Sequence, residues 1–318
     1  MYAIKQRAFG GPEVLEFTEA EQPVPGPDDV LVRVRAASVN PADWKIRTGG
    51  AALPVDLPFI PGFDLAGVVE RIGDRVSRFR PGDDVFGMPT PFTGTYAQYV
   101  RAPAADLALK PAGLDHNQAA ALSSVGLTAW QALVGIARIQ PGQRVLIHAA
   151  AGGIGHIAIQ IAKAFGAHVI GTARTANHGF LRDLGADELV DYTLDDFAAA
   201  VRNVDIVLDN IGHEYGVRSL ATLAPGGHLV STIWDHPGVT AEDVARAKAR
   251  FDTVQVAPSA PDLKELGKLV EQGRIRVHVA DVLPLRDAAE DTVEANQAGS
   301  EANSSLYPRN SRYQLSWR

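Results

Sequence analysis

Residues 148–167 read HAAAGGIGHIAIQIAKAFGA, and this stretch decides the fold. The residues just before it, from Arg144 to His148, are mostly apolar and β-branched, as in a short buried strand. After the glycines, apolar residues recur at spacings of three and four, which is typical of one face of a helix; they are Ile154, Ile157, Ala158, Ile161 and Ala162. Strand, glycine turn and helix in this order predict a dinucleotide-binding unit.

Composition limits what the protein can be. The 318 residues carry a formal net charge of −7, which argues against nucleic-acid and anionic-membrane surfaces. Cysteine is absent, so disulfides, thiolate catalysis and cysteine-bearing zinc sites are excluded. The N-terminal residues do not resemble a signal sequence, and the charge-free run 145–162 is interrupted by glycines and histidines. We expect a soluble cytoplasmic protein that binds neither nucleic acid nor membrane.

Two patterns of strands divide the chain. Residues 1 to about 115 hold alternating stretches such as DDVLVRVRAASVN and GTYAQYVRA, separated by Pro- and Gly-rich turns, which predicts an antiparallel, barrel-like β domain. From about residue 120 the chain alternates strand and helix, which predicts a doubly wound parallel sheet. The predicted strands are 144–149, 168–173, 188–192, 204–209, 228–233 and 252–257, and the predicted helices are 154–166, 177–184, 195–202, 214–223, 241–250 and 261–272.

The expected domain boundaries follow from this change of pattern. Residues 1–118 form the substrate domain, 119–258 the dinucleotide-binding domain, and 259–318 return to the first domain, because RIRVHVADVLPL is strand-like again.

The glycine turn is the predicted pyrophosphate site. The fingerprint Gly-x-Gly-x-x-Gly falls on Ala150, Gly152 and Gly155, with alanine at the first position. The free N–H groups and dipole of the following helix would bind the pyrophosphate. The predicted cofactor contacts here are Ala151, Gly152, Gly153, Ile154 and Gly155. The alternative is a glycine turn needed only for helix–strand packing.

The residues after the second strand predict NADPH rather than NADH. NAD enzymes place an acidic residue there, but this chain has Arg174 and Thr175, with no carboxylate until Asp183. An arginine and a hydroxyl suit a 2′-phosphate. Further predicted contacts are Asn177, His178, Tyr192 and, after the fourth strand, Asn210. A solvated Arg174 and an Asx turn at Asn210 are the alternatives.

Several motifs together resemble the medium-chain dehydrogenase/reductase superfamily, in particular its zinc-free quinone oxidoreductase-like branch. They are GFDLAGVVERIG, RPGDDVFG, GTYAQYV, GLTAWQAL, PGQRVLIHAAAGGIGHIAIQIAKAFGA, LRDLGAD and VDIVLDNIG, in order over about residues 1 to 290. The resemblance implies a GroES-like β-barrel domain, a Rossmann domain and a homodimer or homotetramer, of which we expect the dimer. Zinc members carry a cysteine in the segment that here reads Ser38 to Asp43, and their Gly-His-Glu is here Gly62-Phe63-Asp64. We therefore expect no metal.

The resemblance also implies a substrate site. Asn40 would lie near the nicotinamide and donate to a substrate carbonyl, or else be a turn residue before Pro41. Trp44 and Lys45 would line the substrate pocket, although a solvated Lys45 is an alternative. Thr128 and Ile233 would contact the cofactor, and Trp234 would form a pocket wall or pack in the core or an interface. Asp43 and Arg47 are expected to form a structural ion pair.

Without zinc, reduction of a conjugated C=C or a quinone is the easier chemistry. The predicted function is an NADPH-dependent reductase of quinones or α,β-unsaturated carbonyls. An enoyl-thioester reductase and a low-turnover NADPH-binding protein are the alternatives. The end of the chain, SEANSSLYPRNSRYQLSWR, lacks the apolar strand of the family. We expect residues from about 300 onward to be loosely ordered or to contact a partner subunit.

Overall fold

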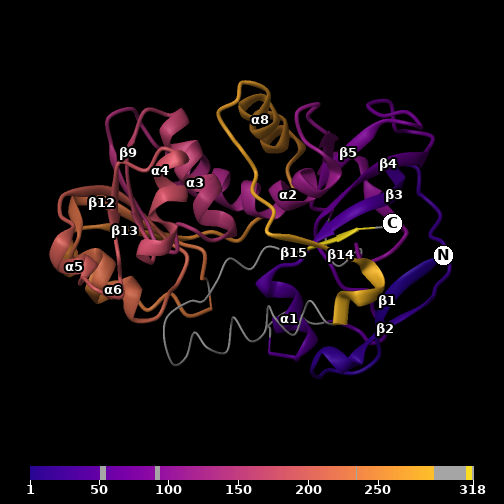
Figure 1. The fold of residues 1–318 in the computed structure, drawn as a ribbon, viewed down its shortest axis with the longest axis horizontal. Coiled ribbons are helices and arrows are strands. Elements are labelled where there is room, and N and C mark those ends of the chain that lie inside the picture. The colour runs from indigo at the N-terminus through magenta and orange to yellow at the C-terminus, as the bar shows by residue number, and fades with distance from the viewer. Residues whose placement is uncertain (51–54, 90–93, 234, 290–312, 317–318) are drawn as a thin grey trace. The chain divides into compact units, whose positions relative to one another are not determined.

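The computed structural model describes residues 1–50, 55–89, 94–233 and 235–289, and the backbone of 313–316. The chain forms two compact units (Figure 1). One unit comprises Met1–Ser124, Pro258–Glu271 and Val277–Arg318, and the other comprises Val125–Ala257 and Gln272–Arg276.

The second unit is built on a six-stranded sheet in which every pairing is parallel. The strand order is β10-β9-β8-β11-β12-β13, so the direction of winding reverses between β8 and β11. Ligands bind at this switch point in doubly wound folds. The six strands are β8 (Arg144–Ile147), β9 (His168–Thr172), β10 (Glu188–Val190), β11 (Val204–Asp209), β12 (Leu223–Ser231) and β13 (Arg250–Thr253). The first four confirm their predictions, β12 begins earlier than predicted, and β13 shares only residues 252–253 with the predicted 252–257.

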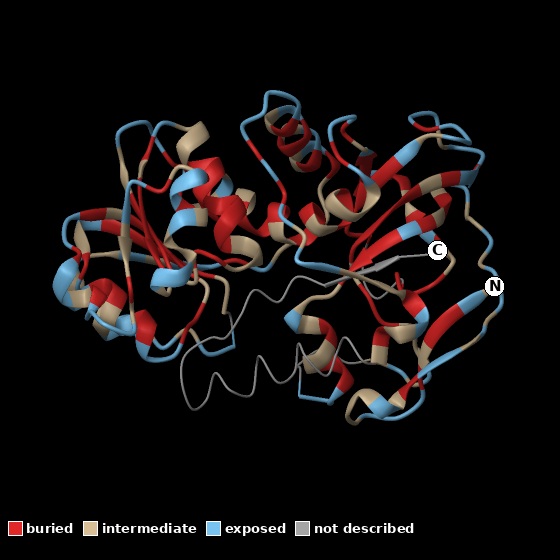
Figure 2. Ribbon diagram, viewed as in Figure 1, coloured by how far each residue is buried: buried red, intermediate tan, exposed pale blue. Residues whose placement is uncertain are grey.

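The predicted helices of this unit are also confirmed, most of them shorter than expected. They are α3 (Gly153–Ala164), α4 (His178–Asp183), α5 (Phe197–Ala200), α6 (Glu214–Leu220) and α7 (Ala241–Ala247), with a 3-10 turn η4 (Thr175–Asn177) before α4. The central strands are buried, as their apolar sequences require (Figure 2). A long helix, α2 (His116–Trp130), continues as the π-helix η3 (Gln131–Ile136).

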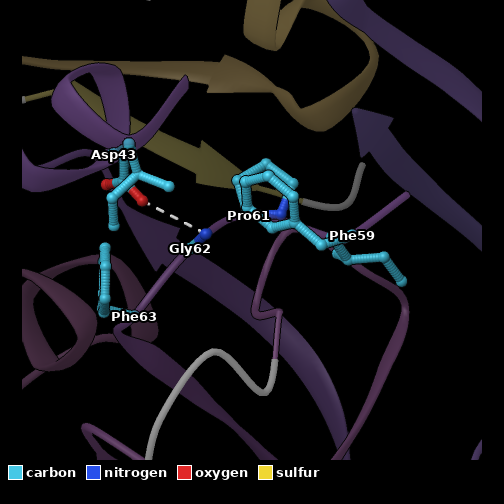
Figure 3. Close-up of a pocket in the computed structure, with 7 residues that line it drawn as sticks. Asp43, Phe59, Pro61, Gly62 and Phe63 are labelled. Atoms are coloured by element: carbon cyan, nitrogen blue, oxygen red, sulfur yellow. Dashed lines mark hydrogen bonds between the residues drawn. The ribbon is translucent and has the colours of Figure 1, made fainter. Parts of the chain in front are cut away.

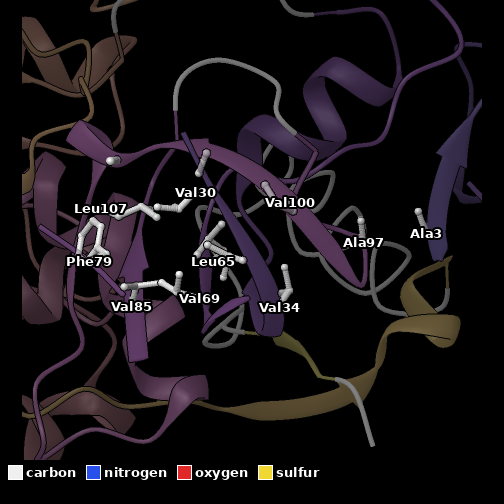
Figure 4. Packing of buried hydrophobic residues seen from close by; sticks show 13 residues of the cluster. Ala3, Val30, Val34, Leu65, Val69, Phe79, Val85, Ala97, Val100 and Leu107 are labelled. Atoms are coloured by element: carbon white, nitrogen blue, oxygen red, sulfur yellow. The ribbon is translucent and has the colours of Figure 1, made fainter. Parts of the chain in front are cut away.

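The first unit is a largely antiparallel β structure, as predicted. Its main sheet has the order β14-β15-β3-β4-β5-β7, and β6 also pairs with β3. The strands are β3 (Asp29–Ser38), β4 (Leu65–Ile72), β5 (Asp84–Gly87), β6 (Tyr99–Pro103), β7 (Leu107–Leu109) and β14 (Asp281–Pro284), and β1 (Tyr2–Gln6) pairs with β2 (Leu15–Glu19). Valines alternate along β3, and Val30, Val32 and Val34 point into one apolar core (Figure 4).

Short helices complete this unit. They are α1 (Pro41–Arg47), α8 (Ala260–Glu271), and the 3-10 turns η1 (Pro12–Val14), η2 (Ala104–Asp106) and η5 (Leu285–Asp287). Helix α1 begins directly after β3, with Asn40 as its N-cap and Pro41 at its first position. Proline is suited to that position, because a backbone N–H there would have no partner within the helix.

The expectation for the C-terminus is wrong for its last part. Residues Tyr313–Ser316 form strand β15, which lies between β14 and β3. Leu315 pairs with Leu283 on one side and with Ala37 on the other. The physical reason is that sheet pairing uses backbone N–H and C=O groups, which a polar segment also has. Residues 300–312 lie outside the described residues.

Gly155 allows α3 to cross the end of β8 at close range. A Cβ at this position would lie 2.4 Å from the Ala149 carbonyl oxygen and 2.7 Å from the Ala150 Cα. Backbone atoms cannot yield as a flexible side chain can. The helix therefore needs glycine here, as the third position of the fingerprint predicts.

We expect Gly155→Ala to lower the free energy of unfolding by about 1–3 kcal/mol, because the added methyl group forces α3 away from the strand. Gly179→Ala in α4 is the matched control, since its Cβ would meet nothing within 4 Å. That change should be neutral or stabilise by up to about 1 kcal/mol. Denaturant unfolding of both variants measures the difference, and equal stabilities would contradict the packing argument.

Candidate functional site

The predicted pyrophosphate site lies at the first turn of α3. Gly152 is the N-cap in extended conformation and, being glycine, has no side chain of its own to cap the helix. The neighbouring residues Ala151, Gly153 and Ile154 lie in the same turn, with Gly155 at the crossing of β8. A twelve-residue helix that begins at a glycine turn at the switch point of a parallel sheet suits an anionic group.

The carboxyl end of β9 carries the residues predicted to select NADPH. Arg174 follows the strand and is half-buried, and Tyr192 is half-buried after β10. The ring of His178 lies 3.0 Å from the Ala173 carbonyl oxygen, measured from Nε2, and Asn177 is the N-cap of α4. These four residues therefore belong to two adjacent strand ends, as predicted from the sequence.

Thr175 is bound differently from the prediction. Its N–H and its hydroxyl both donate to Asp191 Oδ2, and Thr193 donates to Asp191 Oδ1 through its own N–H and hydroxyl. Burial alone would raise the pKa of Asp191, but these hydrogen bonds outweigh it and lower the pKa. The Thr175 hydroxyl is therefore not available as a donor to a phosphate. Asp191 was missed by the sequence analysis because its partners lie in two different turns.

The ends of β11 and β12 are tied to β8 by Asn210. Its Nδ2 donates to the His148 carbonyl oxygen at 2.8 Å, and its Oδ1 accepts from the Thr232 hydroxyl at 3.3 Å. The Asx turn considered for Asn210 is made instead by Asp209, which accepts from the N–H groups of Ile211 and Gly212.

The remaining predicted nicotinamide contacts differ in burial. Thr128 is buried at 7% exposure, and Ile233 is half-buried directly after β12. Trp234 lies outside the described residues.

In the first unit, Asn40 belongs to a polar cluster around Asp64. We call Ser38, Asn40, Asp64 and Ser124 the Asp64 cluster. Asn40 Nδ2 donates to Asp64 Oδ2 at 2.8 Å and to Ser38 Oγ at 3.2 Å. The Ser124 hydroxyl lies 2.7 Å from Asp64 Oδ2 and 3.2 Å from Asn40 Oδ1, and Ser124 N–H donates to Asp64 Oδ1 at 2.9 Å. Ser38 Oγ also contacts Asp64 Oδ2. These contacts fix the position of the Asn40 side-chain amide.

Asp64 is fully buried, and burial raises its pKa although Ser38, Asn40 and Ser124 favour the charged form. From the sequence, Asp64 was predicted only as the counterpart of a residue in zinc relatives, and no role was predicted for Ser124. One sequence signal was present: an aspartate stands directly before the apolar strand that begins at Leu65.

Asp43 is a second buried carboxyl in this unit. Its Oδ2 accepts from Asn40 N–H at 2.8 Å, and its Oδ1 accepts from Gly62 N–H at 3.1 Å (Figure 3). It lines a cavity of about 10 Å³ with Phe59, Pro61 and Phe63 among its walls, which is room for roughly one water molecule. Burial raises the pKa of Asp43 to about 7.

The predicted ion pair between Asp43 and Arg47 is wrong. Asp43 turns back to cap the start of α1, while Arg47 Nε donates to the Gly10 carbonyl oxygen at 3.4 Å. The terminal nitrogens of Arg47, which is 1% exposed, have no hydrogen-bond partner among the described residues. The other predicted substrate residues, Trp44 and Lys45, lie on α1 and are half-buried.

No group of three or more His, Asp or Glu side chains within the described ranges is arranged to hold a metal ion. One described helical segment, His116–Ile136, is long and apolar enough to cross a membrane by length and composition, but most of it is buried inside the structure, as in a core helix.

Two family models match the chain. Residues 26–112 match the alcohol dehydrogenase GroES-like domain, and residues 184–295 match the zinc-binding dehydrogenase family. Quinone oxidoreductase of Sus scrofa is 36% identical over 238 residues, which are 72% of this chain and 72% of that protein. A chloroplastic quinone-oxidoreductase homologue of Spinacia oleracea is 32% identical over 301 residues, covering 90% of this chain and 92% of the relative.

Solved structures agree over the whole chain. The quinone oxidoreductase of Coxiella burnetii matches with a TM-score of 0.89 and 34% identity, covering 100% of this chain and 99% of that one. CurK enoyl reductase matches with a TM-score of 0.88 and 25% identity over 100% and 99% of the two chains. A mycobacterial protein complexed with NADPH matches with a TM-score of 0.85 and 29% identity over 99% and 100%.

The chain therefore belongs to the medium-chain dehydrogenase/reductase superfamily, with a GroES-like domain and a Rossmann-type sheet. Within that superfamily it falls on the quinone oxidoreductase-like branch, as the sequence motifs predicted. It is an oxidoreductase of a family that binds a nicotinamide cofactor.

We expect the free energy of unfolding to depend on pH through Asp43. Its pKa rises from 3.8 to about 7 on folding, so between these values the folded protein holds a proton that the unfolded chain has lost. This contribution to stability is fully present below pH about 4 and is lost as the pH rises through about 7, with a slope of up to about 1.4 kcal/mol per pH unit.

Asp43→Asn should remove this slope. Denaturant unfolding of the wild type and the variant from pH about 4 to about 8 measures the effect. The excess in the wild type's free energy of unfolding over that of the variant should shrink or reverse as the pH rises. Asp183→Asn, which removes an exposed carboxylate, is the control for a simple loss of charge. Parallel curves for wild type and Asp43→Asn would show that Asp43 is ionised throughout.

Proposed function

We propose that the protein is an NADPH-dependent, zinc-independent reductase of quinones or α,β-unsaturated carbonyl compounds. The observation that carries the proposal is the glycine turn at the start of α3, which lies at the switch point of the sheet, with Arg174 directly after the neighbouring strand β9. The quinone oxidoreductase relatives and the NADPH-bound structural relative support it.

The proposed cofactor site uses residues of the second unit. Residues Ala151–Gly155 would bind the pyrophosphate at the N-terminal turn of α3, where the helix dipole favours an anion. Arg174 would bind the 2′-phosphate by charge-assisted hydrogen bonds, with Asn177, His178 and Tyr192 beside it. Thr175 would shape this turn through Asp191. Asn210, Thr128 and Ile233 would lie along the rest of the cofactor. The bound nicotinamide supplies a hydride.

The proposed substrate site uses Asn40, Trp44 and Lys45 of the first unit. Asn40 is partly exposed, and its amide is held by the Asp64 cluster, so it would present a fixed polar surface to a substrate oxygen. Trp44 and Lys45 lie one turn away on α1 and would contact the rest of the substrate. Trp234 is also proposed to form a wall of the substrate pocket. The predicted homodimer and cytoplasmic location also stay predictions.

An enoyl-thioester reductase is the second candidate, because the CurK enoyl reductase shares the fold over the whole chain. The net charge of −7 weighs against it, because an acidic carrier protein or coenzyme A requires a basic rim. A low-turnover NADPH-binding protein is the third candidate.

We expect Arg174→Ala to weaken NADPH binding by about 10-fold or more and to leave NADH binding unchanged, because a hydrogen bond to a charged group contributes about 1.5–3 kcal/mol. Fluorescence titration with both cofactors measures this. Arg182→Ala on α4 is the control for loss of one exposed positive charge. Equal affinity of the wild type for NADPH and NADH would overturn the assignment of Arg174.

The three candidate activities separate in one screen. We expect NADPH oxidation with simple quinones or enones, monitored by absorbance, to exceed that with enoyl thioesters. The reverse order would favour the enoyl-thioester reductase. Tight NADPH binding with no oxidation by either class would favour the low-turnover protein.

A further inference from the structure

The Asp64 cluster contains more contacts than its hydrogens can fill when Asp64 is ionised. Five side-chain contacts join Ser38, Asn40, Asp64 and Ser124. The two hydroxyl groups and the amide carry four hydrogens between them. Ser124 Oγ shows where the shortage falls: its single hydrogen faces both Asp64 Oδ2 at 2.7 Å and Asn40 Oδ1 at 3.2 Å.

Turning the Asn40 amide over does not remove the shortage. The amide oxygen would then face Asp64 Oδ2 at 2.8 Å, and two acceptor oxygens at that distance repel unless a hydrogen lies between them. In both orientations one additional hydrogen on Asp64 completes the set. With the amide as described, this hydrogen satisfies the contact with Ser124 and frees the Ser124 hydroxyl to donate to Asn40. With the amide turned over, it lies between Asp64 Oδ2 and the Asn40 oxygen.

We propose that Asp64 is protonated in the resting protein and that this proton, passed through the Ser124 hydroxyl, is the one that neutralises the reduced substrate. Asp64 is thus a positioning and proton-holding residue that acts through Ser124. This inference rests on the proposed reductase function and names its proton source.

Burial supports the assignment. Asp64 is 0% exposed, Ser124 is 9% exposed and Asn40 is partly exposed, so the contacts run from the interior toward the surface. Burial also raises the pKa of Asp64. The other titratable groups near it are Asp43, whose negative form opposes ionisation of Asp64, and Tyr96 and Arg47, which face Asp43.

The proton balance is simple. Reduction of a quinone or an enone by a hydride leaves a negative oxygen on the substrate, which needs one proton. The Ser124 hydroxyl gives its hydrogen to that oxygen and takes the Asp64 hydrogen in the same event. Asp64 is left as a carboxylate, stabilised by donors from Ser38, Asn40 and Ser124, and it regains a proton from water.

The first test reads the proton directly and needs no activity. In protein labelled with ¹³C at aspartate carboxyl groups, the signal lost in Asp64→Asn identifies Asp64, and Asp43→Asn identifies its neighbour. If Asp64→Asn does not fold, Ser124→Ala identifies the signal by shifting it. We expect the Asp64 signal at its protonated position at pH about 7. A signal at the ionised position there overturns the proposal.

The second test is kinetic. We expect Asp64→Asn and Ser124→Ala each to lower kcat by about 100-fold or more, the usual share of a positioned acid, with the NADPH dissociation constant unchanged. The wild-type decline of kcat at high pH and its solvent deuterium isotope effect should disappear in Asp64→Asn. A kcat within a few-fold of wild type, with the same pH profile, overturns the proposal.

The two tests also separate this inference from the proposed function. A wild-type protein that binds NADPH poorly, or reduces neither quinones nor enones, overturns the reductase proposal and the proton delivery with it. The carboxyl signal would still decide whether Asp64 is protonated.

Discussion

The close approach of helix α3 to strand β8 is the constraint on which the second unit depends. A Cβ at Gly155 would collide with the backbone of Ala149 and Ala150. A Cβ at Gly171 on β9 would lie 3.0 Å from the Ala150 Cβ. Small residues therefore bring α3, β8 and β9 together at one corner. Because that corner lies at the switch point of the sheet, the first turn of α3 faces the position where such folds bind ligands.

In the first unit the corresponding constraint is a buried carboxyl. Zinc relatives use metal ligands in the segments around Ser38 and Asp64, whereas here these residues are joined by hydrogen bonds to Asn40 and Ser124. A buried carboxyl is costly unless its oxygens are satisfied. Satisfying them holds the Asn40 amide rigidly, so the same contacts that stabilise this part of the fold prepare the surface proposed to meet the substrate.

Elements with a strong local signal were predicted correctly. The apolar runs of β8, β9 and β11 and the three- and four-residue spacing in α3 are properties of neighbouring residues, and they survive in the folded chain. The predictions that were wrong concern residues whose contacts are with distant parts of the chain. Strand β15 has a polar sequence, and only its pairing with β14 and β3 makes it a strand. Asp43 was assigned to Arg47, a neighbour on the helix, but its partners include Gly62 N–H and the Tyr96 side chain, which are distant in the sequence.

By itself, the sequence determined the fold class, the superfamily and the position of the glycine turn, because hydrophobic periodicity and the need for glycine act within a few residues. Tertiary structure decided the chemistry around these elements. It brought Ser124 to Asp64, which lies 60 positions away, and to Asn40, which lies 84 positions away. It also turned the Thr175 hydroxyl toward Asp191. Hydrogen bonds depend on distances of about 3 Å between atoms, and no local pattern in a sequence specifies such distances between remote residues.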